Sequence, residues 1–320
     1  MFTTTQIKLA AIALLAAGTL GSATAALAPV HLVFPDGARQ DAWVEVATEV
    51  AIRFKDQANG VNTKDLRIKD LTSLFFYEPS EYTEAMSLFK GRKYAEALPK
   101  FEACAAAYKD TLDVVGNYSA LSRYYAMECH RKLGNIEAMM KVREGFRKER
   151  LSREADRIQF DLYPLLEAVS KRSWEKVEAQ AKQWLARNDL SGSQRAQAGY
   201  CLGMAHEQAG RIEDAMIAFG IGMTASCGED ETVIRESAIG ALRTLNNDPL
   251  VKTAIKLYGT EHEADQSTGH LRLLEAGRLA TVFPKRFGAG RALPPEFTPL
   301  LQYKKKEEVA KEAGVEVKKP

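Results

Sequence analysis

The apolar positions of this chain follow two different periods, and the change of period divides it. Between residues 30 and 77 they form short runs rich in β-branched and aromatic residues, separated by turn signals such as Pro35-Asp36-Gly37. From about residue 80 onward they recur three and four positions apart, which predicts helices with one apolar face. We therefore expect a mostly α protein with a small N-terminal β-rich module in residues 26–77.

The β-rich module is near the lower size limit for an independent core, so we expect it to pack on the first helices. Its expected strands are Val30–Phe34, Trp43–Val46 and Val50–Phe54, and Leu66–Leu71 and Leu74–Tyr77 supply one or two more. After them, Glu78-Pro79-Ser80 breaks the pattern, and Ser80 is expected to cap a helix that begins at Glu81.

Four segments of the helical part resemble one another. They begin at Gly91, Gly134, Arg172 and Gly210, and each continues into an apolar helix. Their matching residues, Ala97, Met139, Val177 and Ala215, lie 42, 38 and 38 positions apart. Self-similarity at such a period is typical of helix–turn–helix units stacked into a solenoid.

The fourth unit resembles the tetratricopeptide repeat. Leu202-Gly203, His206, Ala215 and Phe219 match the signature Leu-Gly-x-x-Tyr…Ala-x-x-x-Phe, with a histidine ring in the place of tyrosine. Small residues at Gly203 and Ala215 would let two helices approach closely, with Phe219 filling the gap beside them.

The first unit resembles the same signature, and the second and third match it less fully. The matches of the first unit are Ala85, Leu88, Ala97 and Phe101. All periods exceed the 34 residues of the family, which implies longer loops or helices. The resemblance covers about half the mature chain and implies four helical hairpins in residues 78–228, stacked as a solenoid.

Beyond the four units the helical pattern continues without the signature. Glu231–Leu245, a helix opened by Asp248-Pro249, and His270–Val282 are expected to form capping helices within residues 229–282. The prolines that follow predict an extended segment. Together with a Lys/Glu-rich tail it makes up residues 283–320.

The N-terminus has the layout of a secretory signal peptide over residues 1–25. Lys8 precedes an apolar stretch from Leu9 to Leu20, and Ala23-Thr24-Ala25 supplies small residues for cleavage. An uncleaved anchor is the alternative, although the apolar run is short for a span of about 20 residues. No second stretch approaches membrane length. We therefore expect an exported protein of the periplasm or cell envelope, with no transmembrane span after cleavage.

Charge and motifs narrow the classes of function. The chain has 44 basic and 42 acidic residues, and this balance argues against nucleic acid as a partner. Nucleophile elbows, P-loops and dinucleotide fingerprints are missing from the sequence, and His206-Glu207 and His262-Glu263 lack the second histidine of a zinc-protease helix. We expect no cofactor, no metal and no catalytic site.

Four cysteines follow the signal peptide, and export permits disulfides. Cys104 in the second helix of unit one and Cys129 in the first helix of unit two should lie in neighbouring helices, so a Cys104–Cys129 disulfide is one possibility. The alternative is that all four cysteines are small buried apolar residues.

The resemblance implies a binding groove on the inner surface, lined by the first helix of each unit. Tyr82, Tyr124 and Tyr200 recur there, and a ladder of tyrosines suits an extended peptide. The alternative is that these rings only pack helices together. Further groove residues are expected one and two turns on, at Met86, Glu128, Arg131, Met204 and Glu207.

The resulting hypothesis is a non-enzymatic scaffold or adaptor that binds a protein or peptide partner of the cell envelope in this groove. One alternative is an envelope hydrolase that uses carboxylates such as Glu128 and Glu207. Another is a structural subunit that self-associates by end-to-end stacking of its repeats.

Overall fold

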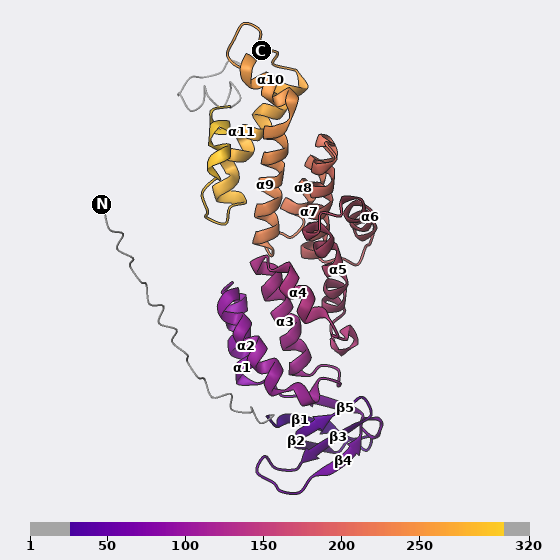
Figure 1. Ribbon diagram of the computed structural model, residues 1–320. Coiled ribbons are helices and arrows are strands. Elements are labelled where there is room, and N and C mark those ends of the chain that lie inside the picture. The colour runs from indigo at the N-terminus through magenta and orange to yellow at the C-terminus, as the bar shows by residue number, and fades with distance from the viewer. Residues whose placement is uncertain (1–25, 304–320) are drawn as a thin grey trace, which may run out of the picture.

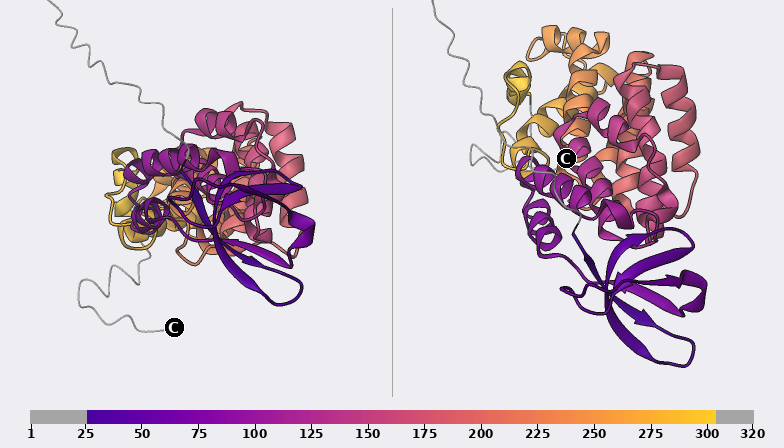
Figure 2. Two further views of the ribbon diagram at one scale, coloured as in Figure 1. Left: turned by 90° about the horizontal axis from the view of Figure 1, so that it is seen from below. Right: turned by 60° about the horizontal axis from the view of Figure 1, so that its bottom comes forward.

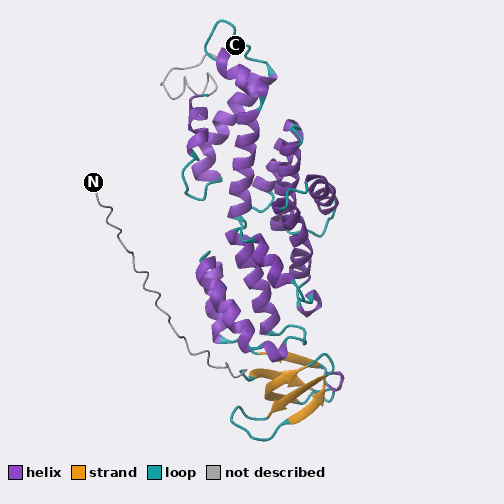
Figure 3. Cartoon of the chain, in the orientation of Figure 1, coloured by secondary structure: helices purple, strands orange, loops and turns teal. Residues whose placement is uncertain are grey.

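The computed structural model describes residues 26–303 of the chain. The predicted signal peptide and the residues from Lys304 onward lie outside this range. The described part is mostly helical and begins with a small antiparallel sheet (Figures 1 and 3), as the hydrophobic periods predict. Within residues 26–303, no helix is both long enough and apolar enough to cross a membrane.

The sheet contains five antiparallel strands in the order β4-β3-β2-β1-β5. Alternate residues of β1 are buried, which gives the sheet one core face. This face packs against Tyr108 and Val114, which follow the first helical hairpin, so the module does share its core with the helices. The strands are β1 (Ala28–Val33), β2 (Arg39–Ala47), β3 (Ala51–Lys55), β4 (Lys64–Arg67) and β5 (Ser73–Phe76).

Eight helices follow as four antiparallel pairs. They are α1 (Ser80–Lys90) and α2 (Tyr94–Ala107), α3 (Tyr118–Leu133) and α4 (Ile136–Arg143), α5 (Glu154–Ser170) and α6 (Trp174–Leu185), and α7 (Gly192–Gln208) and α8 (Ile212–Thr224). We number these pairs hairpins 1 to 4. Helix α1 begins one residue earlier than predicted, because Pro79 rather than Ser80 occupies the N-cap position.

One turn geometry recurs in all four hairpins. Its left-handed residue has a φ of 62° at Arg92, 78° at Gly134, 54° at Arg172 and 70° at Gly210. In each case the N–H of this residue bonds the carbonyl three positions back, and the next N–H bonds the carbonyl five positions back, as in Arg211 to His206 at 3.0 Å. This is the Schellman motif. In hairpin 1 the left-handed residue is Arg92, one position after Gly91, at which the first of the four similar segments begins.

The matching residues five positions after each turn are fully buried. Ala97, Met139, Val177 and Ala215 each expose 0% of their surface. The close approach expected in hairpin 4 also occurs, since a Cβ at Gly203 would lie 2.5 Å from the ring of Phe219. The repeated spacing in the sequence therefore reflects a repeated turn and a repeated core position.

The chain continues through α9 (Glu231–Asn247), α10 (Pro249–Leu257) and α11 (Thr268–Arg286). Asp248 caps α10 as expected, with its Oδ1 accepting from the N–H of Leu250 at 2.8 Å. The first turn of α9 meets the last turn of α3 end to end (Figure 1), because the N-cap Asp230 binds Arg131 of α3. Figure 2 shows the sheet at one end of this array from two further directions.

The expected extended segment from residue 283 is wrong for residues 283–286 and 295–302, which are helical. Helix α11 runs through Phe283 and Pro284, and Pro295–Gln302 forms a 3-10 helix, η4. Phe297 and Leu300 are three positions apart, so they face the same side of a 3-10 helix. Both are buried in the cluster that also contains Phe283 of α11. Burial of this apolar face outweighs the tendency of the prolines to extend the chain.

Candidate functional site

The predicted tyrosine ladder does not form an open surface. Tyr82 and Tyr124 are buried, with 7% and 5% of their surface exposed. Tyr82 packs edge-on against Phe101 and Tyr118, and Tyr200 is half-buried beside Phe219. This corrects the expectation that these rings line an accessible wall. Their surroundings match the alternative, in which they pack helices together.

The predicted charged groove residues are buried too. Arg131 donates to both carboxylate oxygens of Glu128, at 2.9 and 2.8 Å, and to Asp230 Oδ2 at 2.8 Å. The hydroxyl of Tyr163 donates to Glu128 Oε1 at 2.8 Å. Lys132 Nζ lies 2.8 Å from Asp230 Oδ1. We call Glu128, Arg131, Lys132 and Asp230 the ionic cluster.

The ionic cluster is held in its charged state by mutual pairing. Burial alone would raise the pKa of both carboxyl groups. The positive charges of Arg131 and Lys132 and the hydrogen bonds to each carboxylate together outweigh this effect, so the pKa of Glu128 and of Asp230 is lowered. Burial and the neighbouring Arg131 lower the pKa of Lys132. Charges removed from water cost several kcal/mol each unless they are paired, so each member depends on the others.

Other polar side chains of the inner helices also pair with one another. Gln159 of α5 and Gln197 of α7 form a buried hydrogen bond at 3.0 Å. Glu207 of α7 accepts from Arg243 of α9 at 2.6 Å. The array therefore curves tightly enough for polar residues of successive inner helices, and of α9, to meet. The face expected to form an open groove is covered at these positions, while Met86 and Met204 remain half-buried.

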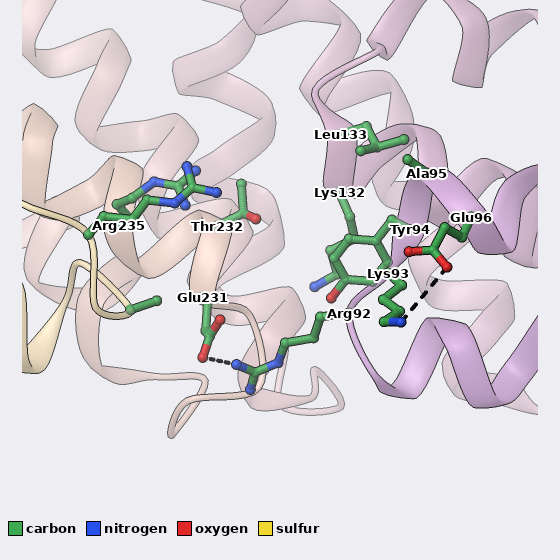
Figure 4. Close-up of a pocket in the computed structure, with 12 residues that line it drawn as sticks. Arg92, Lys93, Tyr94, Ala95, Glu96, Lys132, Leu133, Glu231, Thr232 and Arg235 are labelled. Carbon is green, nitrogen blue, oxygen red and sulfur yellow. Dashed lines mark hydrogen bonds and ion pairs between the residues drawn. The ribbon is translucent and has the colours of Figure 1, made fainter.

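A pocket of about 350 Å³ lies beside the ionic cluster (Figure 4). Arg235 and Thr232 of α9 form one wall, and Tyr94 and Lys132 face them from hairpins 1 and 2. The loop after α11 contributes to the rim. The residues that line the pocket are Arg92, Lys93, Tyr94, Ala95, Glu96, Lys132, Leu133, Glu231, Thr232, Arg235, Ala289 and Arg291.

Basic side chains outnumber acidic ones on this lining, five to two. Arg92 forms an ion pair with Glu231 across the pocket mouth, and Lys93 lies 3.8 Å from Glu96. Arg291 has no ion-pair partner within residues 26–303. The first turn of α2, which also lines the pocket, has no side-chain cap on its N–H groups. Uncapped N–H groups at the start of a helix, together with an excess of cationic side chains, favour the binding of a negatively charged group.

The sequence did not reveal this pocket. Its only local signal is the run of basic residues at the hairpin turns, as in Arg92-Lys93. The two walls are far apart in the chain, since Arg92 and Glu231 are separated by 139 positions.

The possible Cys104–Cys129 disulfide is not formed in the structure, which has the alternative, free cysteines, at these positions. Both residues are free thiols, buried in one core cluster with Phe101. Burial raises the pKa of Cys129 to about 12. Cys201 is buried as well, and Cys227 is exposed.

One group within the described part of the chain has the composition and spacing to hold a metal ion. Glu263, Asp265 and His270 bring one ligand atom each to within 4.8 Å of the others. Their spacing in the chain, Glu-x-Asp-x4-His, is not one of the spacings typical of metal sites, so the sequence does not indicate this group.

Comparison of the chain with protein-family models, with curated proteins and with solved structures gives no match. The resemblance to the tetratricopeptide repeat therefore rests on the residues of the four units alone.

Proposed function

We propose that this protein is a non-enzymatic scaffold of the periplasm or cell envelope, built as a tetratricopeptide-like array, which binds an acidic segment of a protein partner. The shared turn geometry and the four matching buried positions support an array of equivalent hairpins. Arrays of this kind present extended surfaces that bind other proteins. The signal-like residues 1–25 support the compartment.

The pocket between hairpins 1 and 2 and α9 is the observation on which the choice of partner rests. Its lining is rich in arginine and lysine. Arg235 is already paired with Glu236, at 3.1 Å, so the exposed Arg291 is the guanidinium group that can bind a carboxylate with two parallel hydrogen bonds. An aspartate, a glutamate or a C-terminal carboxylate of the partner would fit this chemistry. The rest of the partner would contact the half-exposed outer helices.

The residues expected to line a groove receive other roles in this proposal. Tyr82 and Tyr124 stabilise the helix packing, and Glu128 and Arg131 hold α9 against α3. The glutamates considered as catalytic carboxylates, Glu128 and Glu207, are each paired with an arginine. This arrangement supports structural roles for both.

The experiment starts with affinity capture from the native envelope to identify the partner, followed by binding measurements with both purified proteins. The test variant carries Lys93→Glu and Arg291→Glu, which reverse two exposed charges at the pocket. The control carries Lys176→Glu and Lys252→Glu, which change the net charge equally at exposed positions of α6 and α10.

We expect the pocket variant to bind at least about tenfold more weakly and the control to bind as the wild type does. Binding should also weaken as salt rises, because the pocket charges are accessible to counterions. Equal affinity of the two variants would contradict the proposed site.

A further inference from the structure

The loop between α10 and α11 brings two acidic residues and a histidine together. Glu263 and Asp265 lie in the loop, and His270 lies in the first turn of α11. The imidazole of His270 stacks on the ring of Tyr258, with ring centroids 6.1 Å apart, and this contact fixes its plane. The side chain of His270 exposes 8% of its surface and that of Glu263 exposes 11%.

The carboxylate of Glu263 is oriented but incompletely bonded. Its Oε2 accepts from the backbone N–H of Gly259 at 3.1 Å. Its Oε1 is buried and makes no hydrogen bond within the described residues, although it lies 3.3 Å from His270 Nδ1. A charge-assisted hydrogen bond between these groups would be shorter, at about 2.7–2.9 Å.

The separation of these two atoms fits a shared metal ion better than a hydrogen bond. Two ligands of a tetrahedral zinc ion, each bound at about 2.1 Å, lie about 3.4 Å apart. The ligand atom of Asp265 lies within 4.8 Å of the other two, and this exposed side chain would turn toward the ion on binding. One imidazole with two carboxylates is also a ligand set that Zn²⁺ accepts. We infer that Glu263, Asp265 and His270 form a binding site for Zn²⁺.

The three side chains would leave one coordination position of the ion open toward a pocket. Glu263 and His270 lie on the lining of a pocket of about 340 Å³, which they share with Leu250, Ala254 and Leu257 of α10. This pocket provides a path for the ion and room for a water molecule as the fourth ligand. The site is independent of the basic pocket beside the ionic cluster, so failure of either proposal leaves the other standing.

The test is a calorimetric titration of the full protein, freed of metal by a chelator, with Zn²⁺ and in parallel with Mg²⁺. The visible absorption of bound Co²⁺ serves as a second readout, since it reports on tetrahedral coordination. Glu263→Gln and Asp265→Asn each remove a charged ligand while keeping the size of the side chain. His262→Ala is the matched control, because His262 lies in the same loop with 75% of its side chain exposed and outside the cluster.

We expect one Zn²⁺ per chain, no comparable binding of Mg²⁺, and unchanged affinity in His262→Ala. Loss of a group that only supports a ligand weakens metal binding by about 10–100-fold, so loss of a direct ligand should cost at least about tenfold. Absence of Zn²⁺ binding by the wild-type protein would overturn the inference. The inference would also be overturned if Glu263→Gln and Asp265→Asn bound Zn²⁺ as tightly as the wild type does, or if His262→Ala lost binding.

Discussion

Two of the contacts between helix α9 and the hairpins are built from opposite kinds of residue. At its N-terminal end, the N-cap Asp230 binds Arg131 and Lys132 of α3; we call this the charged junction. Along its length, α9 packs closely against α8 because glycines occupy the positions of contact. A Cβ at Gly222 of α8 would lie 2.1 Å from Ser237 Oγ, and one at Gly240 of α9 would lie 2.5 Å from the ring of Phe219. We call this second contact the glycine junction.

The two junctions join α9 to the hairpins in physically different ways. The charged junction depends on buried ions that compensate one another, so the removal of one partner leaves the others unpaired in a nonpolar environment. The glycine junction depends on the distance between backbones, so it is sensitive to added volume and insensitive to charge. Substitutions at the two junctions should therefore differ both in size and in their dependence on pH.

The largest effect should follow loss of the central carboxylate. Asp230→Ala leaves Arg131 and Lys132 without their shared partner, and we expect a loss of about 3–5 kcal/mol in the free energy of unfolding. Urea denaturation followed by circular dichroism measures this value. Asp189→Ala, which removes an exposed pair with Arg187, should cost about 1 kcal/mol or less. If Asp230→Ala also lost only about 1 kcal/mol or less, the charged junction would not stabilise the contact between α9 and α3.

A smaller effect should follow from one methyl group at the glycine junction. Gly222→Ala forces the methyl group into Ser237, and we expect a loss of about 1–3 kcal/mol from overpacking. Gly220 is the matched control, since it lies two residues earlier in α8 and a Cβ there would meet nothing within 4 Å. Gly220→Ala should stabilise the helix by about 0.5–1 kcal/mol. If both variants shift the urea midpoint in the same direction, close backbone approach does not explain the junction.

The smallest difference should appear on acidification. The pKa of Asp230 is lowered below 3.8 in the folded protein, so its contribution to stability is present above that pH and is lost as pH falls toward the folded pKa. The wild type and Gly222→Ala should therefore lose stability between pH 5 and 3 in parallel, and Asp230→Asn should lose less. Asp156, whose pKa is raised by burial, is present in all three chains and cancels in the comparison. Urea unfolding at each pH measures these losses. If the wild type and Asp230→Asn lost the same free energy of unfolding between pH 5 and 3, the charged junction would not be the source of the pH dependence.

Much of the fold could be predicted from the sequence because its signals are local. The strand and helix periods each act over a few residues, and the hairpin turn is a local motif marked by glycine at Gly134 and Gly210. In hairpins 1 and 3 an arginine, Arg92 or Arg172, takes the left-handed conformation, so these turns carry no glycine to mark them. The C-terminal prolines were misread because burial of Phe297 and Leu300 is a tertiary effect.

The site could not be predicted in the same way. Helical spacing correctly places Tyr124, Glu128 and Arg131 on related positions of α3, but it does not show whether that side of the helix is open or covered. The partner that covers it, Asp230, lies 99 positions from Arg131. The curvature that brings them together is the sum of small packing angles over several hairpins, and no single segment of sequence contains it.

The array curves back so that α9 is joined to α3 through buried charges. A double-mutant cycle with Arg131→Met and Asp230→Asn tests this contact most directly, with the free energy of unfolding measured for the wild type, both single variants and the double variant. Close, buried charge pairs give coupling energies of about 1.5 kcal/mol or more, and we predict a value in that range. A coupling energy below about 0.5 kcal/mol would mean that the two side chains do not depend on one another, and it would contradict the closed arrangement described above.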